Sequence, residues 1–112
     1  MSSPFLIALV KSITWEAEDV ISIELHPAPG SSEFVNFEPG SHIDLNLPNG
    51  LVRSYSLLND SRESHRYVVA VLKDAKSRGG SKFIHEQLHV GMTLQISKPR
   101  NNFPLESSEK RK

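Results

Sequence analysis

The sequence contains no cysteine among its 112 residues. Without thiols the chain cannot form a disulfide, a thiolate zinc site or a cysteine-ligated iron–sulfur cluster of its own. It has no excess of charge either, because 13 basic residues balance 13 acidic ones. A neutral chain has no general electrostatic attraction to nucleic acid or to an anionic membrane. Composition therefore argues against both kinds of partner.

Long hydrophobic runs are also absent. The apolar segment 4–10 is short and no basic residue precedes it, whereas a secretory signal needs both features. We interpret this segment as an opening strand. No apolar run approaches the length that spans a membrane, so we expect a cytoplasmic protein. A chain of this length fits one domain with a core of its own.

Short segments in which apolar and polar residues alternate dominate the sequence. They cover residues 21–26, 42–47 and 94–97, and each predicts a strand with one buried face. Tyr67–Leu72 is apolar at every position, which predicts a strand covered on both sides. Pro48-Asn49-Gly50 separates two strand-like runs and predicts a hairpin, because Asn-Gly accepts the positive φ of a tight turn.

One segment predicts a helix. Ser81 is a candidate capping residue, and Phe83, Ile84 and Leu88 then recur at helical spacing until Gly91. Several strands at intervals of about ten residues, with a single helix, indicate a mainly β protein. The expected architecture is a closed Greek-key barrel.

The tetrapeptide Arg53-Ser54-Tyr55-Ser56 follows the hairpin and is expected to lie on a strand. Side chains alternate along a strand, so Arg53 and Tyr55 would share one face. An arginine for an anion beside an aromatic for a flat ring suits a phosphorylated cofactor with a planar head, whose edge Ser56 could hydrogen-bond. Taken alone, these residues are more simply explained as a surface arginine and a barrel tyrosine.

Two further segments could contact a ligand. Gly79-Gly80-Ser81 lets the backbone approach closely, and the helix after it presents free N–H groups that suit a phosphate. The segment 99–104 (PRNNFP) combines two stiffening prolines with Asn102 and the flat face of Phe103. Ordinary loops explain both segments equally well.

The segment 85–89 (HEQLH) matches the zinc-protease pattern H-E-x-x-H. That pattern places two histidines one helical turn apart and requires a third ligand at a predictable position. His26, His42 and His65 do not show suitable spacing. We therefore interpret the match as accidental and expect no metal site.

Considered together, these segments resemble one family. The stretches that carry the resemblance are 37–42 (FEPGSH), 53–57 (RSYSL), 79–81 (GGS) with His85, and 99–105 (PRNNFPL). Their order and spacing are similar to those of the phthalate dioxygenase reductase and vanillate O-demethylase reductase family, over nearly the whole chain. R-x-Y-S alone marks the wider ferredoxin-reductase superfamily, and the G-G-S-x-x-x-H and P-R-N-N-F-P-L stretches narrow it to this branch.

The resemblance implies a six-stranded antiparallel Greek-key barrel that binds FMN, over residues 1–105, with 106–112 as a polar tail or linker. The FMN would accept a hydride from NADH and pass electrons to a [2Fe-2S] centre, as in the reductase component of an aromatic-ring or O-demethylating oxygenase. Arg53 and the Gly80-Ser81 helix start would hold the phosphate. The implied cofactor-binding residues are Arg53, Ser54, Tyr55, Ser56, Val71, Leu72, Lys73, Gly79, Gly80, Ser81, Asn102 and Phe103.

The sequence also departs from the complete family pattern. It has neither a nucleotide-binding fingerprint nor cluster cysteines, so nicotinamide-binding and ferredoxin domains would have to be supplied in cis or in trans. We expect flavin binding with weak or absent NADH oxidation by this chain alone. The alternatives are FAD in place of FMN, an oligonucleotide-binding-like barrel, and a docking domain without cofactor. Neutral charge and few aromatics argue against the nucleic-acid alternative.

Overall fold

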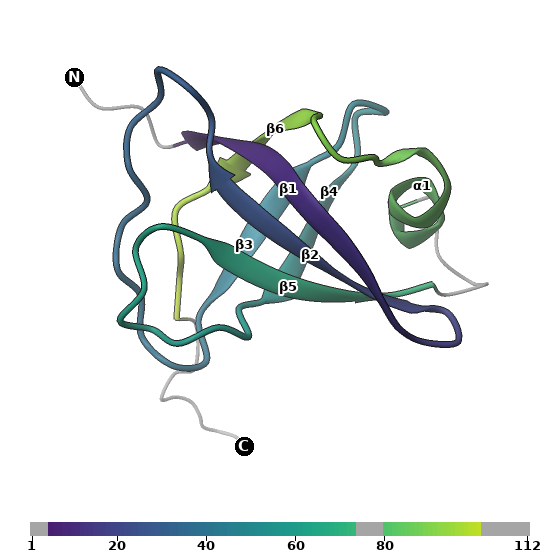
Figure 1. Cartoon of the computed structure of the whole chain (residues 1–112), viewed down its shortest axis with the longest axis horizontal. Coiled ribbons are helices and arrows are strands. Elements are labelled where there is room, and N and C mark those ends of the chain that lie inside the picture. Colours follow the sequence, from purple (N-terminus) through teal and green to yellow (C-terminus); the bar gives the residue numbers. More distant parts are fainter. Residues whose placement is uncertain (1–4, 74–79, 102–112) are drawn as a thin grey trace.

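The computed structural model describes residues 5–73 and 80–101, with side chains from residue 82 onward in the second part. The elements are β1 (Phe5–Ala17), β2 (Val20–Pro27), β3 (His42–Asn46), β4 (Val52–Ser56), β5 (Tyr67–Leu72), α1 (Gly80–Gln87) and β6 (Thr93–Ser97). Figure 1 shows the six strands and the helix, which lies beside the end of β5. No helix among the described residues is both long enough and apolar enough to cross a membrane.

All strand pairs are antiparallel, and the order in the sheet is β4-β3-β6-β1-β2-β5. Because β6 lies between β3 and β1, the chain crosses from one part of the sheet to another, as in a Greek key. The two end strands meet where Leu57 pairs with Val69, and the Leu58 N–H donates to the Val68 carbonyl at 2.8 Å. This contact closes the sheet, so the predicted mainly β Greek-key barrel is confirmed.

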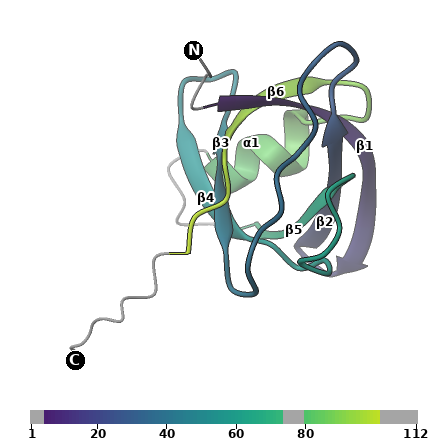
Figure 2. The same ribbon diagram turned by 90° about the vertical axis from the view of Figure 1, so that its left-hand side faces the viewer.

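The interior is filled by the alternating apolar residues of β1, β2, β3, β5 and β6, as the period-two pattern predicts, whereas β4 contributes no fully buried residue. Helix α1 adds Ile84 to this core, and Leu88, which directly follows the helix, adds a second side chain. Figure 2 looks along the barrel and shows α1 across its far end. The side chains with no exposed surface include Ile23, Leu25, Ile43, Leu45, Tyr67, Val69, Val71, Ile84 and Ile96.

The predicted hairpin between β3 and β4 is confirmed. Gly50 takes the positive φ of 91°, and its N–H donates to the Leu47 carbonyl at 2.9 Å. The Asn49 side chain accepts a hydrogen bond from the Leu51 N–H. This turn sets the register that brings Arg53 opposite Leu45 and Tyr55 opposite Ile43.

Two expectations from the sequence are wrong. Strand β5 is not covered on both sides, since Leu72 is 61% exposed and only alternate residues are buried. A closed barrel has a single interior, so the outer face of β5 stays partly in water even though it is apolar. Ser81 does not precede the helix, because α1 already begins at Gly80. Ile84 anchors this helix in the core.

Candidate functional site

The barrel closes incompletely between β4 and β5. Beyond the Leu57–Val69 bridge, the same register would place Tyr55 opposite Val71 and Arg53 opposite Lys73. The described residues form no ladder there, and β4 and β5 are the two ends of the sheet. We call this region, residues 53–56 of β4 with 71–73 of β5, the unpaired seam. Two adjacent strand edges without a β partner expose backbone donors and acceptors that a ligand can use.

Arg53 and Tyr55 share one face of β4, as predicted. Both side chains are half-buried, whereas Val52, Ser54 and Ser56 are exposed. Their cross-strand neighbours on β3 are fully buried, so the pair lies on the barrel-facing side of the strand. The alternation therefore places a cation and an aromatic ring side by side at the seam.

Arg53 has no carboxylate partner among the described residues. The other three described arginines, Arg62, Arg66 and Arg100, all form ion pairs. The Arg53 guanidinium donates only to the Val52 carbonyl, at 2.8 Å, within the described part of the chain. An arginine that is half-buried and unpaired is available to a ligand anion, and its planar fork matches a phosphate.

Tyr55 packs against the edge of the hydrophobic core, and its hydroxyl makes no hydrogen bond within the described residues. Burial raises the pKa of Tyr55, and the nearby charge of Arg53 opposes that rise. The ring therefore remains neutral at ordinary pH. It offers an apolar face of the kind that a flat heterocycle stacks on or packs against.

The side chains of Ser54 and Ser56 lie on the opposite, outer face of β4. Ser54 Oγ donates to the Asp44 carboxylate, which also accepts two hydrogen bonds from Arg100, at 2.8 and 3.0 Å. The hydrogen bonds from Arg100 are the main reason that the pKa of Asp44 lies below its ordinary value. Ser54 is thus engaged with β3, and the structure leaves only its main chain toward the seam.

On the other side of the seam, at the end of β5, lie the three residues that were predicted to pass along the flavin. Their side chains point in different directions. Val71 is fully buried and its carbonyl oxygen lies 2.9 Å from His85 Nε2. Leu72 points to the outside of the barrel. Lys73 Nζ lies 3.5 Å from a carboxylate oxygen of Glu86 on α1. The end of β5 is therefore linked twice to the helix.

The remaining predicted residues are only partly described. Gly80 is the first residue of α1, so a helix N-terminus follows the seam as the sequence indicated. Gly79, Asn102, Phe103 and the side chain of Ser81 lie outside the described residues, as does the segment 106–112. The structure thus brings together Arg53, Tyr55, the end of β5 and α1.

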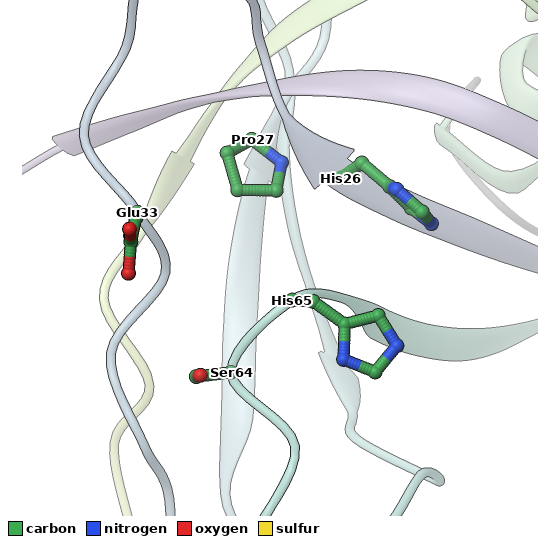
Figure 3. Close-up of a pocket in the computed structure, with 5 residues that line it drawn as sticks. All are labelled: His26, Pro27, Glu33, Ser64 and His65. Atoms are coloured by element: carbon green, nitrogen blue, oxygen red, sulfur yellow. The ribbon is translucent and has the colours of Figure 1, made fainter.

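Another pocket, of about 420 Å³, lies away from the predicted residues. Its lining residues are His26, Pro27, Glu33, Ser64 and His65 (Figure 3). Sequence reasoning did not indicate it, because the lining comes from three segments distant in the chain. None of the candidate cofactor residues lines it. We therefore base no function on it.

The histidines of the HEQLH segment have different partners. His85 reaches Val71 of β5, while His89 Nδ1 lies 3.3 Å from the Val90 carbonyl oxygen. Glu86 faces Lys73. Within residues 5–73 and 80–101 no group of three or more histidine or carboxylate side chains is placed to hold a metal ion.

Known proteins resemble this chain closely. Vanillate O-demethylase oxidoreductase from Pseudomonas putida is 51% identical over 104 residues, which are 93% of this chain and 32% of that protein. Tetrachlorobenzoquinone reductase from Sphingobium chlorophenolicum is 51% identical over 96 residues, 86% of this chain and 29% of that protein. The chain spans about a third of the length of the curated relatives it matches.

Among solved structures, phthalate dioxygenase reductase superimposes with a TM-score of 0.83 at 40% identity, covering 91% of this chain and 32% of that one. It is described as a modular structure for electron transfer from pyridine nucleotides to [2Fe-2S]. No protein-family model matches the chain. The resemblance seen in the sequence is confirmed: over most of its length the chain is homologous to reductases of oxygenase systems.

Proposed function

We propose that this chain, a homologue of the vanillate O-demethylase and phthalate dioxygenase reductases, is the flavin-binding domain of such a reductase. The observation that carries the proposal is the half-buried Arg53, without a carboxylate partner among the described residues, beside Tyr55 on the unpaired seam. We assign the domain to residues 1–105 and regard 106–112 as the start of a linker.

FMN is the cofactor that fits these residues best. Arg53 and the start of α1 at Gly79-Gly80-Ser81 would hold its phosphate. The Tyr55 side chain would contact the ring system, and Ser54 and Ser56, whose side chains lie on the outer face, would contact it through their main chain. Val71, Leu72 and Lys73 would pass along the flavin through their backbone, and Asn102 and Phe103 would lie near it. Bound there, FMN would accept a hydride and release electrons one at a time.

The chain's own contribution is to bind, orient and shield the flavin. A charge-assisted hydrogen bond contributes about 1.5–3 kcal/mol, so two or three of them at the phosphate support roughly micromolar binding. The neutral Tyr55 ring and the core beneath it exclude water from one side of the seam.

The partners follow from the relatives' length. Since this chain corresponds to a third of them, the nicotinamide-binding and [2Fe-2S] domains would occupy the remainder, in the same chain or in others. The complete protein would deliver electrons from NADH to an oxygenase. Alone, this domain would bind flavin and oxidise NADH slowly or not at all, because no described residue is placed to hold the nicotinamide against the ring.

Titration of the purified chain with FMN, FAD and riboflavin, followed by flavin absorbance and fluorescence, tests the proposal. We expect saturable binding with a perturbed flavin spectrum and FMN the tightest of the three. FAD binding more tightly than FMN would correct the cofactor. Absence of binding by all three flavins would contradict the function.

A further inference from the structure

His85 makes a directional contact between α1 and the strand that borders the seam. Its Nε2 lies 2.9 Å from the Val71 carbonyl oxygen, and the ring is half-buried. A carbonyl oxygen can only accept, so Nε2 must carry the hydrogen in this contact. The bond therefore holds whether the imidazole is neutral with its proton on Nε2 or is doubly protonated.

The place of this bond relates it to the proposed flavin site. Val71 is the residue that the β4–β5 register sets opposite Tyr55. Two positions further along the chain, the ion pair of Lys73 with Glu86 joins the same two parts of the structure. Both contacts come from the last turn of α1, and His85 lies five residues after Gly80, about 7.5 Å along the helix axis.

The other contacts of α1 do not fix its orientation equally well. Ile84 of α1, and Leu88 directly after it, anchor the helix in the core, but apolar packing is non-directional and tolerates small rotations and shifts. The hydrogen bond from His85 to one backbone carbonyl fixes the last turn of α1 against β5, and the hydrogen-bonded helix transmits this restraint to its first turn. The residues that connect β5 to α1, 74–79, lie outside the described part of the chain.

We propose that His85 is a positioning residue for the flavin phosphate. Its bond to the Val71 carbonyl sets the N-terminal turn of α1 at the distance from Arg53 that lets both hold one phosphate. The inference rests on the proposed function, and it assigns a role to the first histidine of the HEQLH segment. His85 itself touches no ligand.

The test is a set of variants of the full chain, titrated with FMN and with riboflavin, which lacks the phosphate. His85→Leu should raise the FMN dissociation constant about tenfold, since a displaced helix terminus loses charge-assisted contacts, and change riboflavin binding less than about twofold. His85→Gln, whose amide can donate to the same carbonyl, should restore FMN binding to within about threefold of the original.

The matched control is His89→Leu, which removes the second histidine of the segment. His89 is exposed and its ring contacts only the neighbouring Val90 carbonyl among the described residues, so FMN binding should not change. Thermal midpoints of all variants separate loss of stability from loss of affinity. A purely structural role for His85 would lower the midpoint and weaken FMN and riboflavin equally, and that result would overturn the inference.

If His85→Leu does not fold, His85→Asn replaces it, because asparagine is polar but one methylene shorter than glutamine. Weaker FMN binding by the His85→Asn variant than by the His85→Gln variant supports positioning, and equal binding overturns it. The original chain and Arg53→Ala are measured alongside. If the original chain binds FMN, and Arg53→Ala weakens this binding while the His85 variants do not, only this inference is refuted. Absence of flavin binding by the original chain refutes the proposed function and this inference with it.

Discussion

Replacing Arg53 by alanine tests the phosphate contact on which the proposed function depends. Arg53 is the one described arginine without a carboxylate partner, and its guanidinium donates to the Val52 carbonyl. A hydrogen bond to a charged group contributes about 1.5–3 kcal/mol. Because the Arg53 side chain is partly exposed and must exchange its bond to Val52, the lower end applies, about 1.5–2 kcal/mol, or roughly a ten- to thirtyfold loss of FMN affinity.

The assay compares FMN and riboflavin by fluorescence titration at one ionic strength. Riboflavin has no phosphate, so Arg53→Ala should weaken its binding less than about threefold. Arg53→Lys should fall between the original chain and the alanine variant, because lysine keeps the charge but loses the planar fork. Raising the salt concentration should reduce the difference in FMN affinity between the original chain and the Arg53→Ala variant, because salt partly screens the contact between Arg53 and the phosphate.

The matched control is Arg62→Ala, which removes the same charge from a side chain that is 89% exposed and paired with Asp60. It should leave the affinity for both flavins unchanged. Equal weakening of FMN and riboflavin by Arg53→Ala would refute the phosphate role of Arg53. Equal weakening of FMN by the two arginine variants would show that net charge, and not a contact, determines affinity.

Three further outcomes are expected. Asp44→Asn should lower the free energy of unfolding by about 1 kcal/mol, because it weakens a bidentate, partly exposed pair with Arg100. The pKa of Asp44 lies below 3.8 in the folded protein, so this stability is present above that pH and is lost as the pH falls through the folded value. Urea denaturation of the original chain and of the Asp44→Asn variant over a pH series measures the difference in their free energies of unfolding. A difference that does not change with pH would contradict the ion pair of Asp44 with Arg100. Burial raises the pKa of Tyr67 to about 12. Near-ultraviolet absorbance should therefore show no ionisation of Tyr67 at its ordinary pKa of 10, and stability should fall as the pH rises from 10 to about 12. Added zinc should change neither the thermal midpoint nor flavin affinity; stoichiometric zinc in the purified protein would contradict our interpretation of the HEQLH segment, in which His89 has no ligand role.

Much of the fold could be predicted because it depends on local periodicity. Alternation of apolar and polar residues predicted β2, β3 and β6, and Gly50 predicted the β3–β4 hairpin through its positive φ. The same alternation placed Arg53 and Tyr55 on one face of β4. The family resemblance, carried by several short stretches in a fixed order, added the cofactor and the reaction.

The errors arose where local pattern and tertiary environment differ. An entirely apolar strand such as β5 is typical of a sheet covered on both faces, but a closed barrel covers only one. Ser81 is a good capping residue by composition, yet α1 begins before it. The pocket near His26 and His65 joins the end of β2 to two loops, and no sequence motif marks such a meeting of distant segments.

The amino-acid sequence by itself determined the strands, the turn at Gly50 and the shared face of Arg53 and Tyr55, because these follow from backbone geometry over a few residues. Only the tertiary structure decided what those residues meet. The Greek-key order brings β6 beside β3, so that Arg100, which follows β6, donates to the Asp44 carboxylate that also accepts the hydrogen bond from Ser54. The incomplete closure of β4 on β5, and the bond from His85 to Val71, likewise depend on how distant segments pack, which no local pattern specifies.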